Sequence, residues 1–315
     1  YPKEKVEIIV VEGRQPSFQR NEAVKQASGD ILYFLDSDSE ADIDLFRLVA
    51  RAFNSYKDKN VAVVGGPSEI MQSDSLLQRC FGYVLSSYFA VASVRCRYRS
   101  INRQPCLASE RMLILANMAV KRQVFEEAGG LDTRLYPNEE NEFLNRLAAK
   151  GYRFIYHPHA KVRRPHRTSL PKFIRQMFTY GRGRAEQLRV GPQFLSPIYL
   201  LPLLFAIYVI SLPFAPFLLD LDWPLLVYLI PLALYVHAAA VTTLRILIDE
   251  REWKLIFVVP FLFPIVHVSY AVGLAWGMVK RMPQRASMAE HEQSRRSDLT
   301  VKIVQPFSDS DKAGG

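Results

Sequence analysis

Short apolar runs alternate with amphipathic stretches over the first 160 residues, and this pattern predicts an α/β fold. Four runs are too short for helices and are bounded by turn-forming or charged residues, so each predicts a strand: residues 6–11, 31–35, 61–64 and 113–120. Residues 18–27 predict a short helix that Gly29 ends. The order strand, helix, strand indicates a right-handed crossover in a parallel sheet, with 31–35 as a fully buried strand.

The strand at 31–35 ends in two carboxylates, Asp36 and Asp38. Ligands of open α/β sheets bind beyond the carboxyl ends of the strands, so both side chains are expected where a ligand lies. Their spacing turns them the same way, and paired carboxylates suit Mg²⁺ or Mn²⁺ bridging to a diphosphate. An acidic cap for the following helix explains the same residues, because Asp-x-Asp is a common string. Glu12, after the first strand, is either a base-binding or ribose-binding carboxylate or a loop acid.

A second acidic group, Glu139 and Glu140, opens a predicted helix that runs to about Leu147. Acids in a first turn complement the helix dipole, which is one explanation for them. The other is catalytic: a carboxylate at the ligand edge of the sheet can take a proton from an acceptor hydroxyl.

Four motifs occur in one order along the chain, with about 100 residues between the Asp-x-Asp and the acidic pair. They are Gly29 to Asp38, Asn117 to Arg122, Gly129 to Asp132, and Asn138 to Glu142. Together they resemble an inverting family 2 glycosyltransferase over roughly residues 1–190. The resemblance implies a GT-A (Rossmann-like) nucleotide-sugar-binding domain at 1–169. The family's first strand and helix should precede Tyr1, so this domain is expected to be N-terminally truncated.

The resemblance also implies roles for individual residues. Asp36 contacts the nucleotide, and Asp38 binds Mg²⁺ or Mn²⁺ on the diphosphate. Glu12 stands where the family usually has a base-binding Asp. Glu140 replaces the Asp that usually acts as the catalytic base, and Glu139 precedes it.

Four further residues are candidate contacts of the nucleotide sugar. Arg20 and Asn21 lie near the start of the helix that leads to the Asp-x-Asp strand. Arg164 and His166 follow a predicted strand, where family members often place basic residues or a histidine near the diphosphate. A plain basic surface explains Arg164 and His166 equally simply.

Long apolar runs after residue 195 predict an α-helical transmembrane region at 196–279. The runs 196–219, 223–248 and 255–279 are each long enough to cross about 30 Å of hydrocarbon, so about three spans are expected. A basic amphipathic helix at 170–190, interrupted at Tyr180 to Arg184, is predicted to lie on anionic lipid. The polar tail 283–315 has little to bury and is predicted to be disordered.

Charge and cysteine content bear on the location of the chain. The net charge is +9. The loop from Asp220 to Asp222 has no basic residue, whereas Arg245, Arg251, Lys254 and the flank 172–189 are basic, so the loop is expected outside and the catalytic domain in the cytoplasm. Three crossings would then place Lys280 and Arg281 outside, so either this rule is overridden or one proline-rich run is re-entrant. The three cysteines are odd in number and lack metal-type spacing, which predicts reduced structural thiols.

The sequence therefore predicts a multi-pass protein of the inner (plasma) membrane that moves one sugar from a nucleotide sugar to a lipid-linked (polyprenyl diphosphate) saccharide with inversion, in cell-surface polysaccharide biosynthesis. Tyr180 to Arg184 resembles the corresponding stretch of succinoglycan-type enzymes, which act on such acceptors. The expected partners are the donor, the acceptor and membrane lipids, and no nucleic acid. The alternative is a catalytically silent membrane scaffold of GT-A fold that binds nucleotide or an assembly partner.

Overall fold

The computed structural model describes residues 5–191, 197–218, 223–282 and 296–305. These residues belong to two compact units. The first, here called the sheet unit, comprises Tyr1–Glu69, Arg99–Arg164 and Arg281–Gly315. The second, the helical unit, comprises Ile70–Tyr98 and Pro165–Lys280. Residues 70–98 therefore lie outside the sheet unit, although the sequence places them within a continuous domain at 1–169.

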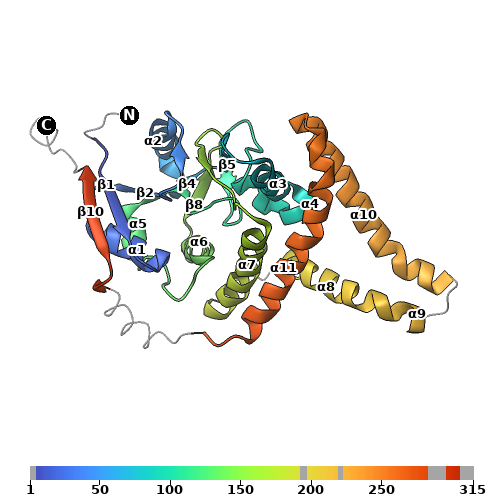
Figure 1. The fold of residues 1–315 in the computed structure, drawn as a ribbon. Coiled ribbons are helices and arrows are strands. Elements are labelled where there is room, and N and C mark those ends of the chain that lie inside the picture. Colours follow the sequence, from blue (N-terminus) through green and yellow to red (C-terminus); the bar gives the residue numbers. More distant parts are fainter. Residues whose placement is uncertain (1–4, 192–196, 219–222, 283–295, 306–315) are drawn as a thin grey trace, which may run out of the picture. The chain divides into compact units, whose positions relative to one another are not determined.

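The main sheet of the sheet unit has five strands in the order β2-β7-β4-β8-β6. Strands β2, β4 and β8 are labelled in Figure 1. Their bounds are Ile31–Leu35 (β2), Asn117–Lys121 (β7), Val61–Gly65 (β4), Arg153–Tyr156 (β8) and Cys106–Ala108 (β6). Only β4 and β8 are parallel, and the other pairs are antiparallel. The prediction of a parallel sheet with a fully buried strand at 31–35 is therefore wrong. Strand β2 lies at the edge, where Leu32 and Phe34 are buried while Ile31 and Leu35 are exposed.

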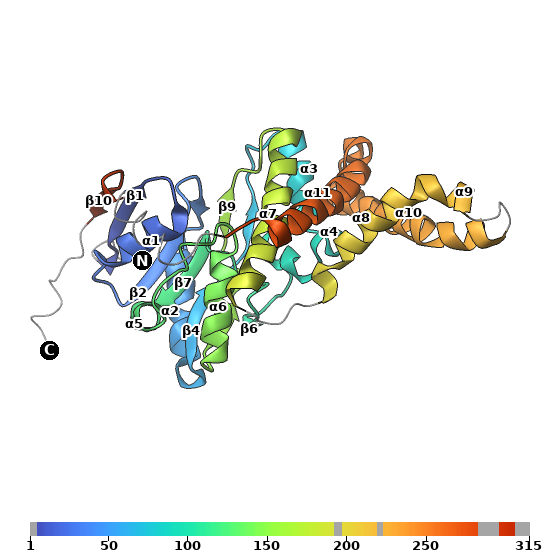
Figure 2. The same ribbon diagram turned by 90° about the horizontal axis from the view of Figure 1, so that it is seen from below.

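A separate two-stranded sheet joins β1 (Ile8–Glu12) to β10 (Thr300–Gln305) in antiparallel register (Figure 2). Strand β1 therefore has no place beside β2, and the predicted crossover is wrong. The prediction of a disordered tail is also wrong for Thr300–Gln305, because this run contains the β-branched residues Val301, Ile303 and Val304 and has a partner strand in β1. Residues 283–295 and 306–315 lie outside the described residues.

A third sheet and four helices complete the described part of the sheet unit. The sheet has the order β3-β9-β5, with bounds Glu40–Ala41, Val162–Arg164 and Ser68–Ile70. The helices are α1 (Pro16–Val24), α2 (Leu45–Ser55), α5 (Arg122–Glu127) and α6 (Glu139–Ala149). Leu45, Val49 and Phe53 of α2 pack on β4, β7 and β8, as their spacing of three and four residues requires.

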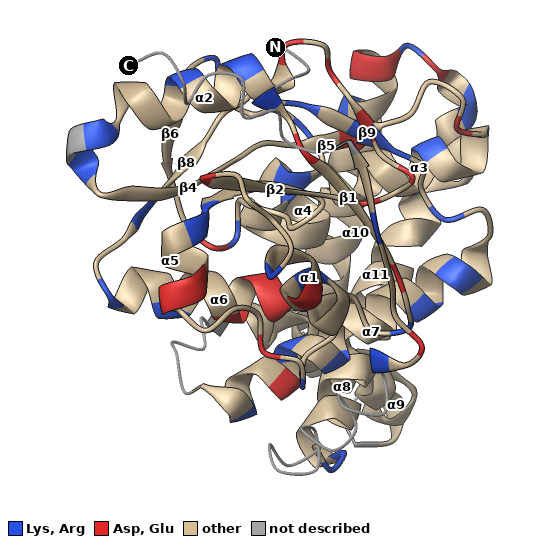
Figure 3. Ribbon diagram, turned by 90° about the vertical axis from the view of Figure 1, so that its left-hand side faces the viewer, with Lys and Arg blue, Asp and Glu red and all other residues tan. Residues whose placement is uncertain are grey.

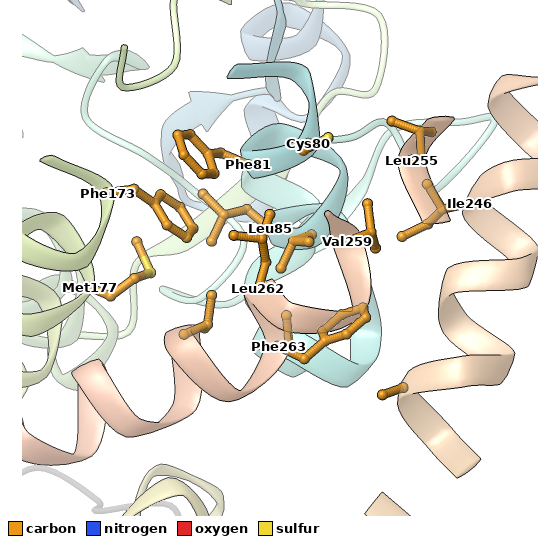
Figure 4. Close-up of a cluster of buried hydrophobic side chains, with 14 of the residues drawn as sticks. Cys80, Phe81, Leu85, Phe173, Met177, Ile246, Leu255, Val259, Leu262 and Phe263 are labelled. Carbon is orange, nitrogen blue, oxygen red and sulfur yellow. The ribbon is translucent and has the colours of Figure 1, made fainter. Parts of the chain in front are cut away.

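The helical unit contains seven described α-helices. They are α3 (Leu76–Leu85), α4 (Tyr88–Val91), α7 (Leu170–Val190), α8 (Leu201–Ser211), α9 (Ala215–Leu218), α10 (Trp223–Glu250) and α11 (Val259–Val279). Its core lies where α3, α7 and the first half of α11 meet (Figure 4). The rings of Phe81 and Phe173 stack there at 4.2 Å between centroids and 4° between planes. Leu262 and Phe263 of α11 fill the same core.

Helix α7 is continuous over Leu170–Val190, so the predicted interruption at Tyr180 to Arg184 is wrong. Its glycines allow a close helix contact instead. A Cβ on Gly181 would lie 2.0 Å from the carbonyl oxygen of Tyr270, and one on Gly273 of α11 would lie 1.9 Å from that of Phe178. Two apolar residues of the face predicted to lie on lipid, Phe173 and Met177, are buried in the core, whereas Ile174 is exposed.

Two described helices, α10 and α11, are long and apolar enough to cross a membrane. The first of the three predicted spans is shorter and broken, because α8 gives way to a 3-10 turn at Leu212–Phe214 before α9 begins. Pro213 and Pro216 lie at this break, where they remove backbone donors from the helix. The prediction of three long spans is therefore corrected to two for the described residues.

Candidate functional site

Four charged side chains from separate elements meet in the sheet unit. Asp36 follows β2, Arg20 lies on α1, Arg164 ends β9 and Glu139 opens α6. Arg20 Nη2 donates to Asp36 Oδ1 at 2.8 Å, and its Nη1 donates to Glu139 Oε1 at 3.2 Å. Arg164 Nη1 donates to the other oxygen of Asp36. These four residues, here called the Arg20 cluster, bring the first and last sequence motifs together, and Figure 3 shows the acids of the first turn of α6 beside α1.

Helix α1 is fixed to the loop that leads into α6. Asn21 Nδ2 donates to the Leu131 carbonyl at 2.8 Å, and its Oδ1 accepts from the Leu131 amide at 2.9 Å. Ser17 Oγ donates to the Leu135 carbonyl at 2.9 Å. The side chain of Asn21, a predicted contact of the nucleotide sugar, thus engages backbone and positions its neighbour Arg20.

Asn117 fixes the loops that carry Arg164, and sequence reasoning assigned it no role. It is fully buried and donates through Nδ2 to the carbonyls of Pro67 and Ala160, both at 2.8 Å. Its Oδ1 accepts from the Tyr33 hydroxyl. Its role could have been predicted from its position at the start of an apolar strand in the second motif, because a buried side-chain amide needs hydrogen-bond partners.

The two adjacent carboxyls of α6 are both buried, at 4% exposure for Glu139 and 8% for Glu140. Burial and, second, the charge of Glu140 raise the pKa of Glu139 from 4.5 to about 8, against the opposing effect of Arg20. Its Oε2 has no hydrogen-bond partner among the described residues. Although Arg20 lies at ion-pair distance, burial disfavours the charged form of Glu139 and holds its pKa above the usual range of a glutamate.

Asp38 is exposed and forms no hydrogen bond or ion pair with any described residue. Asp36, by contrast, has both oxygens bound by arginines. In the described part of the chain, no group of three or more His, Cys, Asp or Glu side chains could hold a metal ion. Magnesium is commonly bound by one or two carboxylates together with substrate phosphates, so Asp38 fits an ion that arrives with a diphosphate.

Two further predicted site residues, Glu12 and His166, also stand outside the four residues of the Arg20 cluster. Glu12 ends β1 and is exposed, and its side chain forms no hydrogen bond or ion pair with the described residues. His166 belongs to the helical unit. There its backbone amide donates to Asp74 Oδ2 at 3.2 Å, and its Nδ1 lies 3.4 Å from the same oxygen. The histidine is thus held by the loop that precedes α3.

Comparison with known proteins adds independent information. Residues 1–183 match the family described as Glycosyltransferase like family 2. A curated relative, the dolichyl N-acetyl-alpha-D-glucosaminyl phosphate 3-beta-D-2,3-diacetamido-2,3-dideoxy-beta-D-glucuronosyltransferase of Methanococcus voltae, is 22% identical over 283 residues, which cover 88% of this chain and 79% of the relative. A similar solved structure is the mannosyltransferase PcManGT from Pyrobaculum calidifontis in complex with GDP-Man and Mn²⁺, with a TM-score of 0.46 and 17% identity over 85% of this chain and 68% of that one. The family match includes every residue of the Arg20 cluster.

Proposed function

Because the chain belongs to the glycosyltransferase-like family 2, we propose that it transfers one sugar, with inversion, from a nucleotide sugar to a lipid-linked acceptor. The observation that carries this proposal is the Arg20 cluster, in which a strand-end carboxylate, Asp36, and the first residue of the buried acidic pair, Glu139, share one arginine. Donor-binding and proton-accepting groups are thereby held next to each other. No observation favours the silent scaffold.

The donor end of the site is formed by Asp36, Asp38 and the two arginines. Guanidinium groups suit phosphate oxygens, so Arg20 and Arg164 hold Asp36 in place and offer positive charge to the diphosphate. Asp38 is the protein ligand for Mg²⁺ or Mn²⁺, which when bound neutralises charge on the departing nucleoside diphosphate. Glu12 remains a candidate contact of the base.

The acceptor end is formed by Glu140. The acceptor hydroxyl oxygen attacks the anomeric carbon, the bond from that carbon to the diphosphate oxygen breaks, and the hydroxyl proton passes to the Glu140 carboxylate. One displacement inverts the anomeric centre, as is typical of the family. Glu139 positions Arg20 rather than accepting the proton, because its pKa is raised and its Oε1 accepts from Arg20.

The acceptor and location follow from the relative and the apolar helices. The name of the Methanococcus voltae relative specifies a dolichyl phosphate-linked sugar, which supports a polyprenyl-type lipid acceptor for this chain. Helices long and apolar enough to cross a membrane support a membrane location for the enzyme. We assign it to the inner membrane as a multi-pass protein with the sheet unit in the cytoplasm.

The test is a transfer assay on the full chain in lipid nanodiscs, with a panel of labelled nucleotide sugars and polyprenyl-linked acceptors. Radiolabel should enter the lipid extract with one donor, and Glu140→Gln should lose this product. Glu126→Gln, on an exposed part of α5, is the matched control and should transfer normally. Nucleotide binding without transfer from any donor would instead establish the scaffold.

A further inference from the structure

We propose that α11 does not cross the membrane but lies in its plane, and that the hydrocarbon is crossed by a hairpin of α8–α9 and α10. This inference rests on the membrane location proposed above. By length alone α11 is suitable as a span, since its 21 residues extend about 31 Å. Its surroundings in the helical unit argue against that role.

Polar groups hold α11 at both ends. Just before it, Glu252 Oε2 pairs with Arg79 of α3 at 3.1 Å. Just after it, Lys280 Nζ pairs with Glu186 of α7 at 3.1 Å. Helix α3 begins six positions after β5 ends, and α7 begins six positions after β9 ends. Both partner helices follow strands of one sheet in the chain, and Glu186 lies 16 positions into α7, so both ends of α11 are held by charged groups on helices that the chain enters from that sheet.

The middle of α11 also has a polar partner. His267 Nε2 lies 3.2 Å from the backbone carbonyl oxygens of Phe89 and Ala90 in α4. Helix α4 continues into the turn that carries Arg95 and Arg97. If α11 crossed the bilayer, His267 would lie near the midplane and would bring this basic turn into hydrocarbon. Charged side chains at that depth cost about 2.5–3.5 kcal/mol each even on permissive insertion scales.

Helix α7 accompanies the second half of α11 closely. Gly181 and Gly273 leave no room for a Cβ between the two backbones. Helix α7 carries six charged residues, namely Lys172, Arg175, Arg182, Arg184, Glu186 and Arg189. A crossing α11 would therefore draw a charged helix into the bilayer, whereas an in-plane α11 leaves α7 in water.

The exposed side chains distinguish α11 from α10. Within the most apolar stretch of each helix, 39% of α11 is buried in the protein but only 6% of α10. Six exposed or half-buried apolar residues of α11 recur at three and four along one face, namely Phe261, Ile265, Val268, Val272, Trp276 and Val279, whereas the half-buried Tyr270 and the exposed Met278 lie off it. One apolar stripe on a helix otherwise packed on protein is typical of a helix lying in the interface. Helix α10 is buried only at Ala239, Thr243 and Ile246 in its second half, and its exposed, uniformly apolar first half is suited to hydrocarbon.

The hairpin supplies the crossings. Helix α10 extends about 42 Å over 28 residues, and α8–α9, residues 201–218, extend about 27 Å. The two run antiparallel, with Tyr208 Oη donating to the Tyr228 carbonyl at 2.9 Å and the rings of Phe205 and Tyr235 stacked at 4.1 Å. Two crossings return the chain to the side from which it left.

The pairing of β10 with β1 requires that the chain end on the side of the membrane from which it left. Strand β10 follows α11 in the sequence but belongs to the sheet unit, so the number of crossings between α7 and β10 is even. The basic residues Arg245, Arg251, Lys254, Lys280 and Arg281 then all lie at cytoplasmic ends, as the positive-inside rule favours. The conflict created by three crossings disappears.

Cysteine accessibility tests the sidedness. In a Cys106→Ala background, where the remaining Cys80 and Cys96 are buried, single cysteines replace Lys57, Lys254, Arg281 or Trp223. A membrane-impermeant maleimide should label the first three from one face of sealed vesicles and Trp223→Cys only from the other. Labelling of Lys254→Cys and Arg281→Cys from opposite faces would overturn the proposal, as would labelling of Trp223→Cys from the face that labels Lys57→Cys.

Depth measurement tests the in-plane helix independently. Single tryptophans at Phe261, Val272 and Val279, with the three native tryptophans changed to Phe, should be quenched alike by brominated lipids of shallow depth. Matched tryptophans at Leu226, Leu234 and Leu244 of α10 should give graded depths. A gradient along α11 of about 1.5 Å per residue, or no quenching on it because a second copy covers the stripe, contradicts the assignment. Release of the chain by alkaline carbonate would overturn the membrane location itself, whereas the labelling and depth results bear on α11 alone.

Discussion

Replacing Glu139 by Gln should change how stability depends on pH. The pKa of Glu139 is raised from 4.5 to about 8, so between these values the folded protein holds a proton that the unfolded chain has lost. The folded state therefore loses stability as pH rises through this window, and the loss is complete above pH 8. The substituted glutamine keeps an oxygen for Arg20 but cannot ionise, so the variant should lack this loss.

The size of the effect follows from the same linkage. One proton of difference changes the free energy of unfolding by about 1.4 kcal/mol per pH unit. A change of 1 kcal/mol moves the unfolding midpoint of a domain of this size by about 2–4 °C. The midpoints of parent and variant should therefore separate by about 3–6 °C per pH unit between pH 5 and 8.

Thermal unfolding of the full chain in nanodiscs, followed by near-ultraviolet circular dichroism from pH 5 to 9, measures this separation. Glu126→Gln is the control, because Glu126 is exposed and its ion pair with Arg122 is long, at 3.9 Å. Parallel pH profiles for the parent and Glu139→Gln would refute the reasoning, since they would mean that Glu139 is ionised in the folded protein at neutral pH.

Three further predictions follow from the site and the helical unit. Glu140→Gln should lower kcat by about 10²–10⁴-fold with donor affinity little changed, while Glu140→Asp retains more activity; an unchanged kcat would move the base elsewhere. Asp38→Ala should abolish the Mn²⁺ dependence of donor binding measured by calorimetry. Equal donor affinities with and without Mn²⁺ in the parent protein would exclude Asp38 as a metal ligand. Gly273→Ala should lower the unfolding midpoint, because its Cβ meets the Phe178 carbonyl, whereas Gly191→Ala meets nothing and should not; equal midpoints would contradict the close contact.

Local pattern was enough to place the two elements that carry the candidate site. The end of β2 and the first turn of α6 are where the sequence expects them, because apolar run length and acidic placement are properties of neighbouring residues. That Arg20 joins Asp36 to Glu139 could not be predicted in the same way. The contact depends on hydrogen bonds from Ser17 and Asn21 to backbone far away in the sequence.

The predictions that were wrong also depend on contacts between residues far apart in the sequence. Strand direction in the main sheet depends on which strands pair, and the five apolar residues at 31–35 do not reveal their partner strand. A glycine such as Gly181 can interrupt a helix or can let a second helix pack closely against it, and the sequence does not distinguish the two. The distinction requires the position of Tyr270 on α11, whose carbonyl oxygen lies against Gly181. The length and apolar composition of α11 predict a helix that avoids water, but they do not reveal the polar groups that hold its two ends.

The pairing of β1 with β10 imposes an order on biosynthesis. A ribosome delivers β10 only after every helix of the helical unit, so β1 is made early and waits without its partner strand. Closing such a long loop is slow, and an unpaired strand edge is prone to aggregate in the interval. Chains stalled after α11 should therefore depend on a chaperone that covers β1, and full-length chains should lose this dependence on release.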